Sequence, residues 1–192
     1  MGLHRFAGRE ASDAAVIAAS GDRPQLFAAI FDRHFDAVHG YLARRIGAGG
    51  ADDLASATFT VAFERRHTFH ADAGSARPWL FGIATNLLRN QWRADRRSHA
   101  LVAELTPRVA AGGTAPDRAA AEVAELLAAL DADQRDVLIL HAWEGFSYRE
   151  IAAALGVPVG TVRSRLARGR AALRSVLAGD AAVGIDAQEA NE

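Results

Sequence analysis

The stretch SYREIAAALGVPVGTVRSRLARGRAALR, residues 147–174, contains two helical segments joined by a turn at Gly156, Val157 and Pro158. Glycine can adopt the left-handed backbone conformation that such a turn requires, and the small Ala152 lets two helices approach closely. We expect helices over residues 147–155 and 159–177, with four apolar side chains filling the angle between them: Ile151, Leu155, Val162 and Leu166. This pattern predicts a helix-turn-helix.

The second of these helices has two faces of different chemistry. At about 100° per residue, one apolar face must be buried; it is formed by Val162, Leu166, Gly169, Leu173 and Val176. Residues 158–177 also carry five arginines and no acidic residue, although the net charge of the whole chain is only −1. The residues that point away are Gly160, Ser164, Ala167 and Arg168, with Thr161 and Arg165 along one flank and Arg163, Arg170 and Arg174 along the other.

This layout is typical of a recognition helix in the major groove of DNA. Small residues allow close approach to base edges, while arginines reach the phosphates on either side. The alternative is a structural helix with a solvated basic face. We predict DNA contacts from Gly160, Thr161, Arg163, Ser164, Arg165 and Arg168.

Upstream, the apolar spacing predicts helices over residues 24–46, over residues 52–67 and from residue 77 to residue 97. The glycines of residues 47–50 should end the first, and Asp52 and Asp53 should lie in the first turn of the second, where acids are favoured. The predicted core stripe of the first helix consists of Phe27, Ile30, Phe31, Phe35, Val38, Leu42 and Ile46.

The helix over residues 77–97 combines an apolar face with a basic, amide-rich one. Its core side is formed by Leu80, Phe81, Ile83, Ala84, Leu87, Leu88 and Trp92. Rings that stack on bases, beside arginines that follow phosphates, suit single-stranded DNA. Alternatively, Trp79 simply anchors the helix in the core. The predicted DNA-facing residues are Trp79, Asn86, Arg89, Asn90, Arg93 and Arg97, with Arg96 on the same face.

The fold class is therefore all-α, with two small helical domains joined by a flexible linker and the helix-turn-helix in the second domain. Pro107, Gly112, Gly113 and Pro116 interrupt helical periodicity and mark the linker. Further helices are predicted over residues 119–130 and 133–142. The expected boundaries are an N-terminal extension at 1–23, a first domain at 24–97, a linker at 98–117, a second domain at 118–178 and an acidic tail at 179–192.

Composition argues against several other classes of protein. The chain has no cysteine, which removes disulfides and thiolate metal sites. No apolar run approaches the roughly 20 residues of a membrane span, and no signal peptide is recognisable, so we expect a cytoplasmic protein without membrane insertion. Glu64 and His67 have the Glu-x-x-His spacing of a di-iron helix but lack a second such pair. We expect no metal, no cofactor and no catalytic residues.

The whole arrangement resembles the extracytoplasmic-function sigma factors of bacterial RNA polymerase. The resemblance covers roughly residues 26–177. It rests on FDRHFDAVHGYLARRIG, DDLASATFTVAF and RPWLFGIATNLLRNQWR in the first domain and on residues 130–174, which contain the helix-turn-helix, in the second.

The resemblance implies how each part would act. The first domain would dock core RNA polymerase through Asp52, Asp53 and Leu54 and melt the −10 element, with Asn86 near a flipped non-template base. The second would read the −35 element through a surface that includes Arg163, Ser164 and Arg168. The implied partners are the clamp and flap regions of core RNA polymerase, promoter DNA and an anti-sigma factor; no small-molecule substrate is implied.

One departure and one rival accompany this interpretation. Where the family usually has glutamine and an acid on the docking helix, this chain has Ser56 and Ala57, which predicts a weaker docking contact. The rival is a helix-turn-helix transcriptional regulator that acts without docking polymerase. Binding to core RNA polymerase discriminates between the two.

Overall fold

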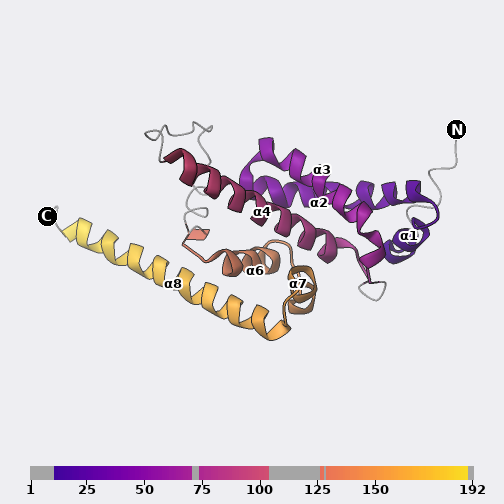
Figure 1. The fold of residues 1–192 in the computed structure, drawn as a ribbon. Helices are drawn as coiled ribbons and strands as arrows, with labels where there is room; N and C mark the ends of the chain where they lie inside the picture. Colours follow the sequence, from indigo (N-terminus) through magenta and orange to yellow (C-terminus); the bar gives the residue numbers. More distant parts are fainter. Residues whose placement is uncertain (1–10, 71–73, 104–125, 128, 190–192) are drawn as a thin grey trace. The chain divides into compact units, whose positions relative to one another are not determined.

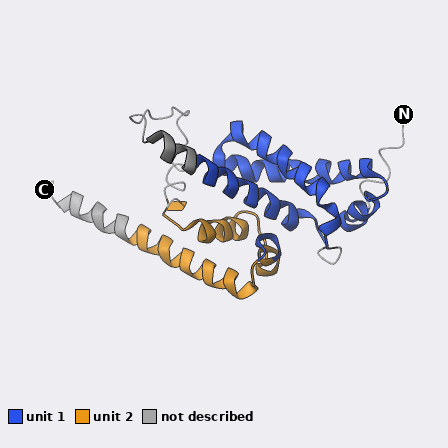
Figure 2. Ribbon diagram, in the orientation of Figure 1, with its two compact units in different colours: residues 1–105, 153–156 blue, residues 106–152, 157–192 orange. Residues whose placement is uncertain are grey.

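Helices form every regular element in the computed structural model, which describes residues 11–70, 74–103, 126–127 and 129–189, with side chains omitted at 96–103 and 179–189 (Figure 1). The all-α prediction is confirmed, since no strand occurs within these ranges. The chain divides into two compact units, residues 1–105 with 153–156 and residues 106–152 with 157–192 (Figure 2). The elements are α1 (Asp13–Ala19), η1 (Pro24–Phe27), α2 (Ala28–Ile46), α3 (Ala48–Glu64), η2 (Arg66–Thr68), α4 (Arg77–Ala103), α6 (Ala132–Ala142), α7 (Tyr148–Leu155) and α8 (Val159–Glu189).

Helices α2, α3 and α4 supply the core of the first unit. The predicted stripe of α2 is largely buried, because Ile30, Val38 and Leu42 have no exposed surface. Phe31 differs: it is 39% exposed, and its ring stacks on Phe35 at a centroid distance of 4.7 Å. Phe31 therefore lies at the edge of the core, where its ring also contacts that of Phe59 at a centroid distance of 4.9 Å.

Helix α3 begins earlier than its sequence predicts. Gly47, at φ 80°, ends the helical conformation of α2, and α3 then starts at Ala48. Gly49 and Gly50 are thus helical rather than part of the break, since packing overrides their low helix propensity. Asp52 and Asp53 consequently lie beyond the first turn, and the predicted acidic helix start is wrong.

Helix α4 is longer than predicted. It runs for 27 residues to Ala103, so the first part of the predicted linker, residues 98–103, is helical. The remainder of that linker and most of the helix predicted over residues 119–130 lie outside the described residues. Leu80, Phe81, Ala84 and Leu88 are fully buried, as their spacing predicts.

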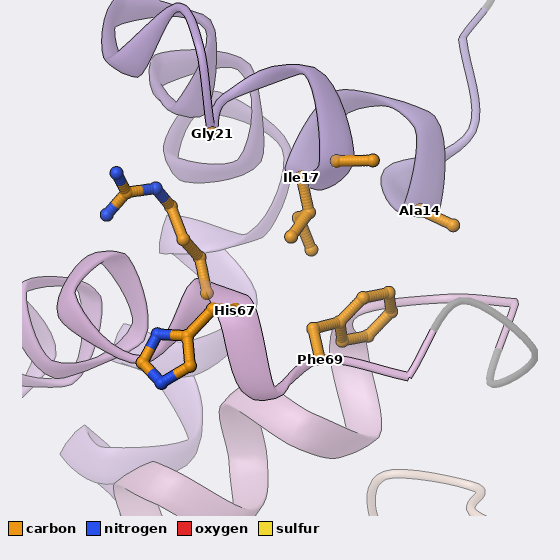
Figure 3. A pocket seen from close by; sticks show the side chains of 7 residues that line it. Ala14, Ile17, Gly21, His67 and Phe69 are labelled. Atoms are coloured by element: carbon orange, nitrogen blue, oxygen red, sulfur yellow. The ribbon is translucent and has the colours of Figure 1, made fainter.

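Helix α1 lies within the stretch expected to be an N-terminal extension. Val16 and Ile17 are buried, so this helix belongs to the packed first unit. Between α1 and the end of α3 is a pocket of about 380 Å³, lined by Ala14, Ile17, Ala18, Gly21, Arg66, His67 and Phe69 (Figure 3). Arg66 lies over the Phe63 ring and donates to the carbonyl oxygens of Phe63 and Ser20. Arg66 thus helps to cap the C-terminal end of α3, and its guanidinium is already hydrogen-bonded.

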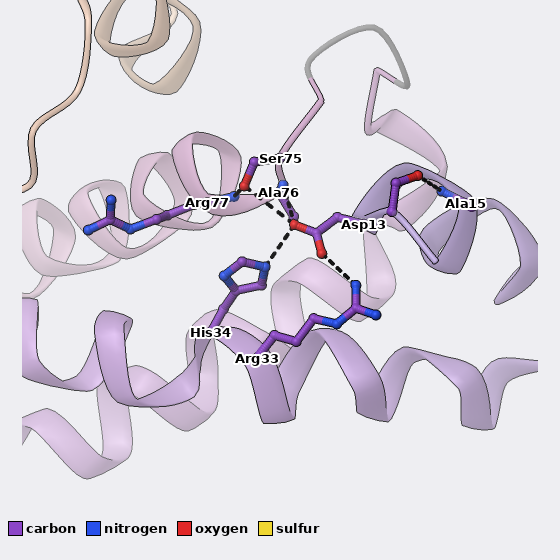
Figure 4. Close-up of polar contacts among 8 residues, drawn as sticks. Asp13, Ala15, Arg33, His34, Ser75, Ala76 and Arg77 are labelled. Carbon is purple, nitrogen blue, oxygen red and sulfur yellow. Dashed lines mark hydrogen bonds and ion pairs between the residues drawn. The ribbon is translucent and has the colours of Figure 1, made fainter. Parts of the chain in front are cut away.

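Asp13, the first residue of α1, connects three segments of the first unit (Figure 4). Its carboxylate is 9% exposed and accepts from Arg33 Nη1 at 2.9 Å, lies 2.8 Å from His34 Nε2, and accepts from the backbone N–H of Ala76 at 2.9 Å. Burial alone raises the pKa of Asp13, but the Ala76 N–H, the Arg33 guanidinium and His34 outweigh it and hold the pKa below its usual value of 3.8.

This network predicts a pH-dependent stability of the first unit. Because the folded pKa of Asp13 is the lower one, the unfolded chain binds more protons, and stability falls as pH drops through the unfolded pKa towards the folded one. Asp13→Asn should remove this part of the pH dependence. Urea unfolding of both forms between about pH 3 and pH 6 measures it. An unchanged dependence in Asp13→Asn would contradict the assignment.

In the second unit, α6 packs against α8. Val137 and Leu140 of α6 and Val162 and Leu166 of α8 are at most 1% exposed. The buried face predicted for α8 is therefore confirmed at Val162 and Leu166, whereas Leu173 and Val176 further along it are only half-buried. Gly169 is also buried, and a β-carbon built there would come within 2.7 Å of Leu138 Cδ1. Glycine thus permits close approach of α8 to α6 at this point.

Helix α7 begins with a reciprocal cap. The Ser147 hydroxyl accepts from the Glu150 N–H at 3.3 Å, and the Glu150 carboxylate accepts from the Ser147 N–H at 2.8 Å and from its hydroxyl at 2.7 Å. This is a capping box. The N-cap residue of α6 behaves differently, because the Asp131 carboxylate accepts from the side chain of Gln134 and makes no capping bond to the backbone.

Ser147→Ala is expected to lower the free energy of unfolding by about 1 kcal/mol, the usual effect of losing a hydroxyl cap. Ser175→Ala, at an exposed position of α8, is the matched control and should change stability little. Denaturant unfolding of both variants measures the difference. Equal effects would show that the cap contributes no special stability.

Candidate nucleic-acid interface

The turn between α7 and α8 has the geometry of a helix-turn-helix. Gly156 adopts the left-handed conformation at φ 64°, and the N–H of Val157 donates to the Ala152 carbonyl at 3.0 Å. Pro158 precedes α8, and its carbonyl accepts from Thr161 N and Val162 N. Gly156 thus adopts the left-handed backbone conformation that the sequence predicts for this turn.

The solvent-facing side of α8 is basic and built on small residues. Its exposed positions include Gly160, Arg163, Ser164, Ala167, Arg168, Arg170 and Arg174. A β-carbon at Gly160 would meet nothing within 4 Å, so the ridge is open at that end. The Arg168 side chain remains exposed, although its Nε lies 3.4 Å from the Ser164 carbonyl oxygen. We name this surface the α8 arginine face.

Arg165 differs from the other predicted contacts of α8. Its guanidinium forms an ion pair and hydrogen bond with Asp133 of α6, and its side chain is 19% exposed. Thr161 is half-buried. Arg165 therefore fixes α8 against α6, a role that its place in the sequence does not reveal, because Asp133 lies 32 residues away.

A second surface lies on α4. Asn86, Asn90 and Arg93 are exposed, and Arg93 donates to the Asn90 side-chain oxygen. Arg89 is half-buried, and the side chain of Arg97 lies outside the described residues. Trp79 is half-buried, with its ring 5.3 Å from that of Phe69. Part of the tryptophan thus anchors the start of α4, as the alternative interpretation held, and part remains accessible.

The predicted docking edge lies on α3. Asp52 and Asp53 are exposed, and Leu54 is half-buried. The Asp52 carboxylate is 2.9 Å from His39 Nε2 of α2, while its side chain remains 77% exposed. Ser56 is exposed and Ala57 half-buried. Asp53 and Ser56 thus belong to one accessible edge. No local sequence signal indicates the pairing of Asp52 with His39.

Other kinds of site find little support in the described part of the chain. Glu64, His67 and His70 are all exposed, and no group of three histidine, aspartate or glutamate side chains is placed there to hold a metal ion. Within the same ranges, no helix is both long enough and apolar enough to span a membrane.

Known proteins share both halves of this architecture. A family model described as Sigma-70 region 2 matches residues 30–98, and one described as Sigma-70, region 4 matches residues 120–173. The chain is 33% identical over 155 residues to RNA polymerase sigma factor CarQ of Myxococcus xanthus, which is 79% of this chain and 88% of CarQ. It is 37% identical over 136 residues to ECF RNA polymerase sigma factor SigC of Mycobacterium tuberculosis, 69% of this chain and 73% of SigC.

The chain belongs to the extracytoplasmic-function (ECF) sigma factors. An ECF sigma factor is a transcription initiation factor that directs RNA polymerase to promoters, so the family and function predicted from the sequence are confirmed. Among solved structures, the sigma factor RpoE of Bartonella quintana, in complex with the anti-sigma factor NepR, has a TM-score of 0.62 and 27% identity. That match covers 79% of this ECF sigma factor and 96% of RpoE.

Proposed function

We propose that this ECF sigma factor binds core RNA polymerase through the exposed edge of α3 and reads promoters through two separate surfaces. The main support for this proposal is the α8 arginine face, which follows the left-handed turn at Gly156. This face presents four exposed arginines together with exposed Gly160, Ser164 and Ala167. Protein–DNA recognition needs this combination, because phosphate contacts position a helix and base contacts specify the sequence. We assign this face to the −35 element.

In the −35 complex, residues near the start of α8 have different tasks. Gly160, Arg163, Ser164 and Arg168 are exposed and are proposed to contact DNA directly. Thr161 contributes from its half-buried position. Arg165, already paired with Asp133, is proposed to act mainly by holding α8 at its angle to α6.

The α4 surface is assigned to the −10 element. Asn86 and Asn90 offer amide groups for base edges, and Arg89, Arg93 and Arg97 offer charge for the phosphates. Trp79 is half-buried, with its ring 5.3 Å from that of Phe69, and we propose that its exposed part stacks on a base. Stacking and arginine contacts together are the usual means of holding single-stranded DNA.

The central test is transcription from a reconstituted holoenzyme. Core RNA polymerase with this chain should start at specific sites in a run-off assay, whereas the chain alone should bind duplex promoter DNA poorly. A pull-down with core polymerase separates this proposal from the rival, a DNA-binding regulator that does not dock polymerase. No gain of promoter specificity at any ratio of chain to core would overturn the proposal.

A prediction about docking follows from Ser56 and Ala57. Replacing them with Gln and Glu adds a hydrogen-bonding group and a charge one turn beyond Asp52 and Asp53. We expect binding to core polymerase to tighten by about 1 kcal/mol, the scale of one hydrogen bond, with DNA preference unchanged. A competition titration against core polymerase measures it.

Asp53→Ala is the weakened control for that titration, because Asp53 is exposed and, unlike Asp52, has no ion pair with His39. It should loosen binding to core polymerase. If the double replacement weakens docking while Asp53→Ala changes nothing, α3 does not face the polymerase.

An anti-sigma factor is the proposed regulatory partner. RpoE of Bartonella quintana was solved with NepR, and CnrH, 29% identical with a TM-score of 0.63, was solved with the cytosolic domain of CnrY. We infer that this chain has a comparable inhibitor, that it works in the cytoplasm with core polymerase, and that it has no catalytic activity of its own. Titration of a candidate inhibitor against the holoenzyme assay tests the first of these points.

A further inference from the structure

We infer that Asp13 is a positioning residue for promoter recognition: it fixes the start of α4, the helix that carries the −10 surface. This inference rests on the proposed function. The −10 surface itself does not include Asp13, which is buried and lies in a different helix, 63 residues before Ala76.

The start of α4 depends on Asp13 for its backbone. The Ala76 carbonyl accepts the first helical hydrogen bond, from Leu80 N at 2.9 Å, so Ala76 is the residue at which the helix direction is set. The N–H of that same residue donates to Asp13 Oδ2 at 2.9 Å. A carboxylate at a helix N-terminus also meets the positive end of the helix dipole. Asp13 therefore caps α4 from outside its own segment.

Ser75 extends this cap by one step. Its hydroxyl lies 3.4 Å from Asp13 Oδ2 and accepts from the Arg77 N–H at 3.2 Å (Figure 4). Two consecutive N–H groups at the beginning of α4 are thus satisfied by Asp13 and by a hydroxyl that Asp13 orients. Trp79 follows two residues later, so its placement depends on the same anchor.

Two basic side chains of α2 fix Asp13 in turn. Arg33 Nη1 donates to Oδ1 at 2.9 Å, and His34 Nε2 lies 2.8 Å from Oδ2. These side chains are 24% and 13% exposed, so both contacts are largely shielded from water. The Arg33–Asp13 ion pair should therefore weaken less with salt than an exposed pair would. The start of α4 is consequently tied to the body of the unit through one carboxylate.

The test compares the full chain with Asp13→Asn, which keeps the shape and removes the charge. The control is Asp22→Asn, which makes the same change at an exposed position. Amide hydrogen exchange over residues 74–80 reports on the anchor without DNA. Competition for core polymerase and holoenzyme binding to a fork-junction DNA with a single-stranded −10 element report on function.

For Asp13→Asn we expect faster exchange at residues 76–80, unchanged affinity for core polymerase, and about fivefold weaker binding to the fork DNA, the equivalent of one hydrogen bond. Unchanged exchange at residues 76–80, or an equal loss of core and fork binding, would overturn the inference. If wild-type holoenzyme itself failed to bind the fork DNA, the proposed function would fail instead, and only the anchoring of α4 would stand.

A second variant keeps the test usable if Asp13→Asn does not fold. Ser75→Ala removes the exposed hydroxyl that accepts from Arg77 N and leaves α1 and its ion pairs in place. It should show the same selective loss of fork binding, to a smaller extent. Wild-type behaviour of Ser75→Ala in both exchange and fork binding would overturn the inference.

Discussion

Arg168→Ala is expected to change which −35 sequences the holoenzyme prefers. Arg168 is exposed on α8, on the side opposite the buried Val162 and Leu166, where a guanidinium can reach base edges in the major groove. A good base contact contributes about 1–3 kcal/mol of discrimination. Sequences that depend on that contact should therefore lose roughly tenfold or more in binding, while others lose little.

Arg174→Ala provides the contrast on the same helix. Arg174 is also exposed but lies further along α8 than Arg168, at a position where we expect a phosphate contact. Such a contact carries no sequence information, so binding to all −35 variants should weaken alike and the salt dependence should become shallower. Holoenzyme binding to a panel of −35 variants at two salt concentrations measures both. Equal losses on every sequence for Arg168→Ala would remove it from base recognition.

Leu166→Ala should have the largest effect on stability. Leu166 is 1% exposed and lies on the apolar face of α8 that packs against α6. Truncating a buried leucine removes apolar contact and leaves a cavity, at a cost of about 2–5 kcal/mol. A small helical unit has little stability to spare, so we expect the second unit to unfold in part or entirely and −35 recognition to be lost.

The matched control is Leu177→Ala, the same substitution on the same helix at a side chain that is 53% exposed. It should change the free energy of unfolding by well under about 1 kcal/mol, as surface substitutions usually do. Amide exchange separates the effects, because in Leu166→Ala protection should fall in α6 and α8 and persist in α2. If both leucine variants lose the same stability, α8 is not packed as described.

The helical class, the helix-turn-helix and the basic character of α8 can all be predicted from the amino-acid sequence alone. These features are local: periodicity over a few turns assigns the buried face on which Val162 and Leu166 lie, and Gly156 supplies the conformation for the turn. The Ser147–Glu150 cap was equally local, and its Ser-x-x-Glu spacing is a recognised signal. The assignment of each domain to a promoter element comes from the family resemblance, because hydrophobic periodicity carries no information about DNA sequence.

The roles of individual charged side chains, in contrast, depend on tertiary packing. Helical spacing places Arg165 on a flank of α8 and Arg168 on its outward side, and it predicts DNA contacts for both. Packing of α8 on α6 instead brings Arg165 to Asp133 and leaves Arg168 exposed. Asp13 lies in the stretch that the sequence predicts as an N-terminal extension, but tertiary packing places α1 beside α2 and the start of α4. Helix α3 likewise began at Ala48 despite two glycines. These outcomes depend on contacts between residues far apart in the chain, and a charge pattern along one helix cannot specify which partner the fold will bring to it.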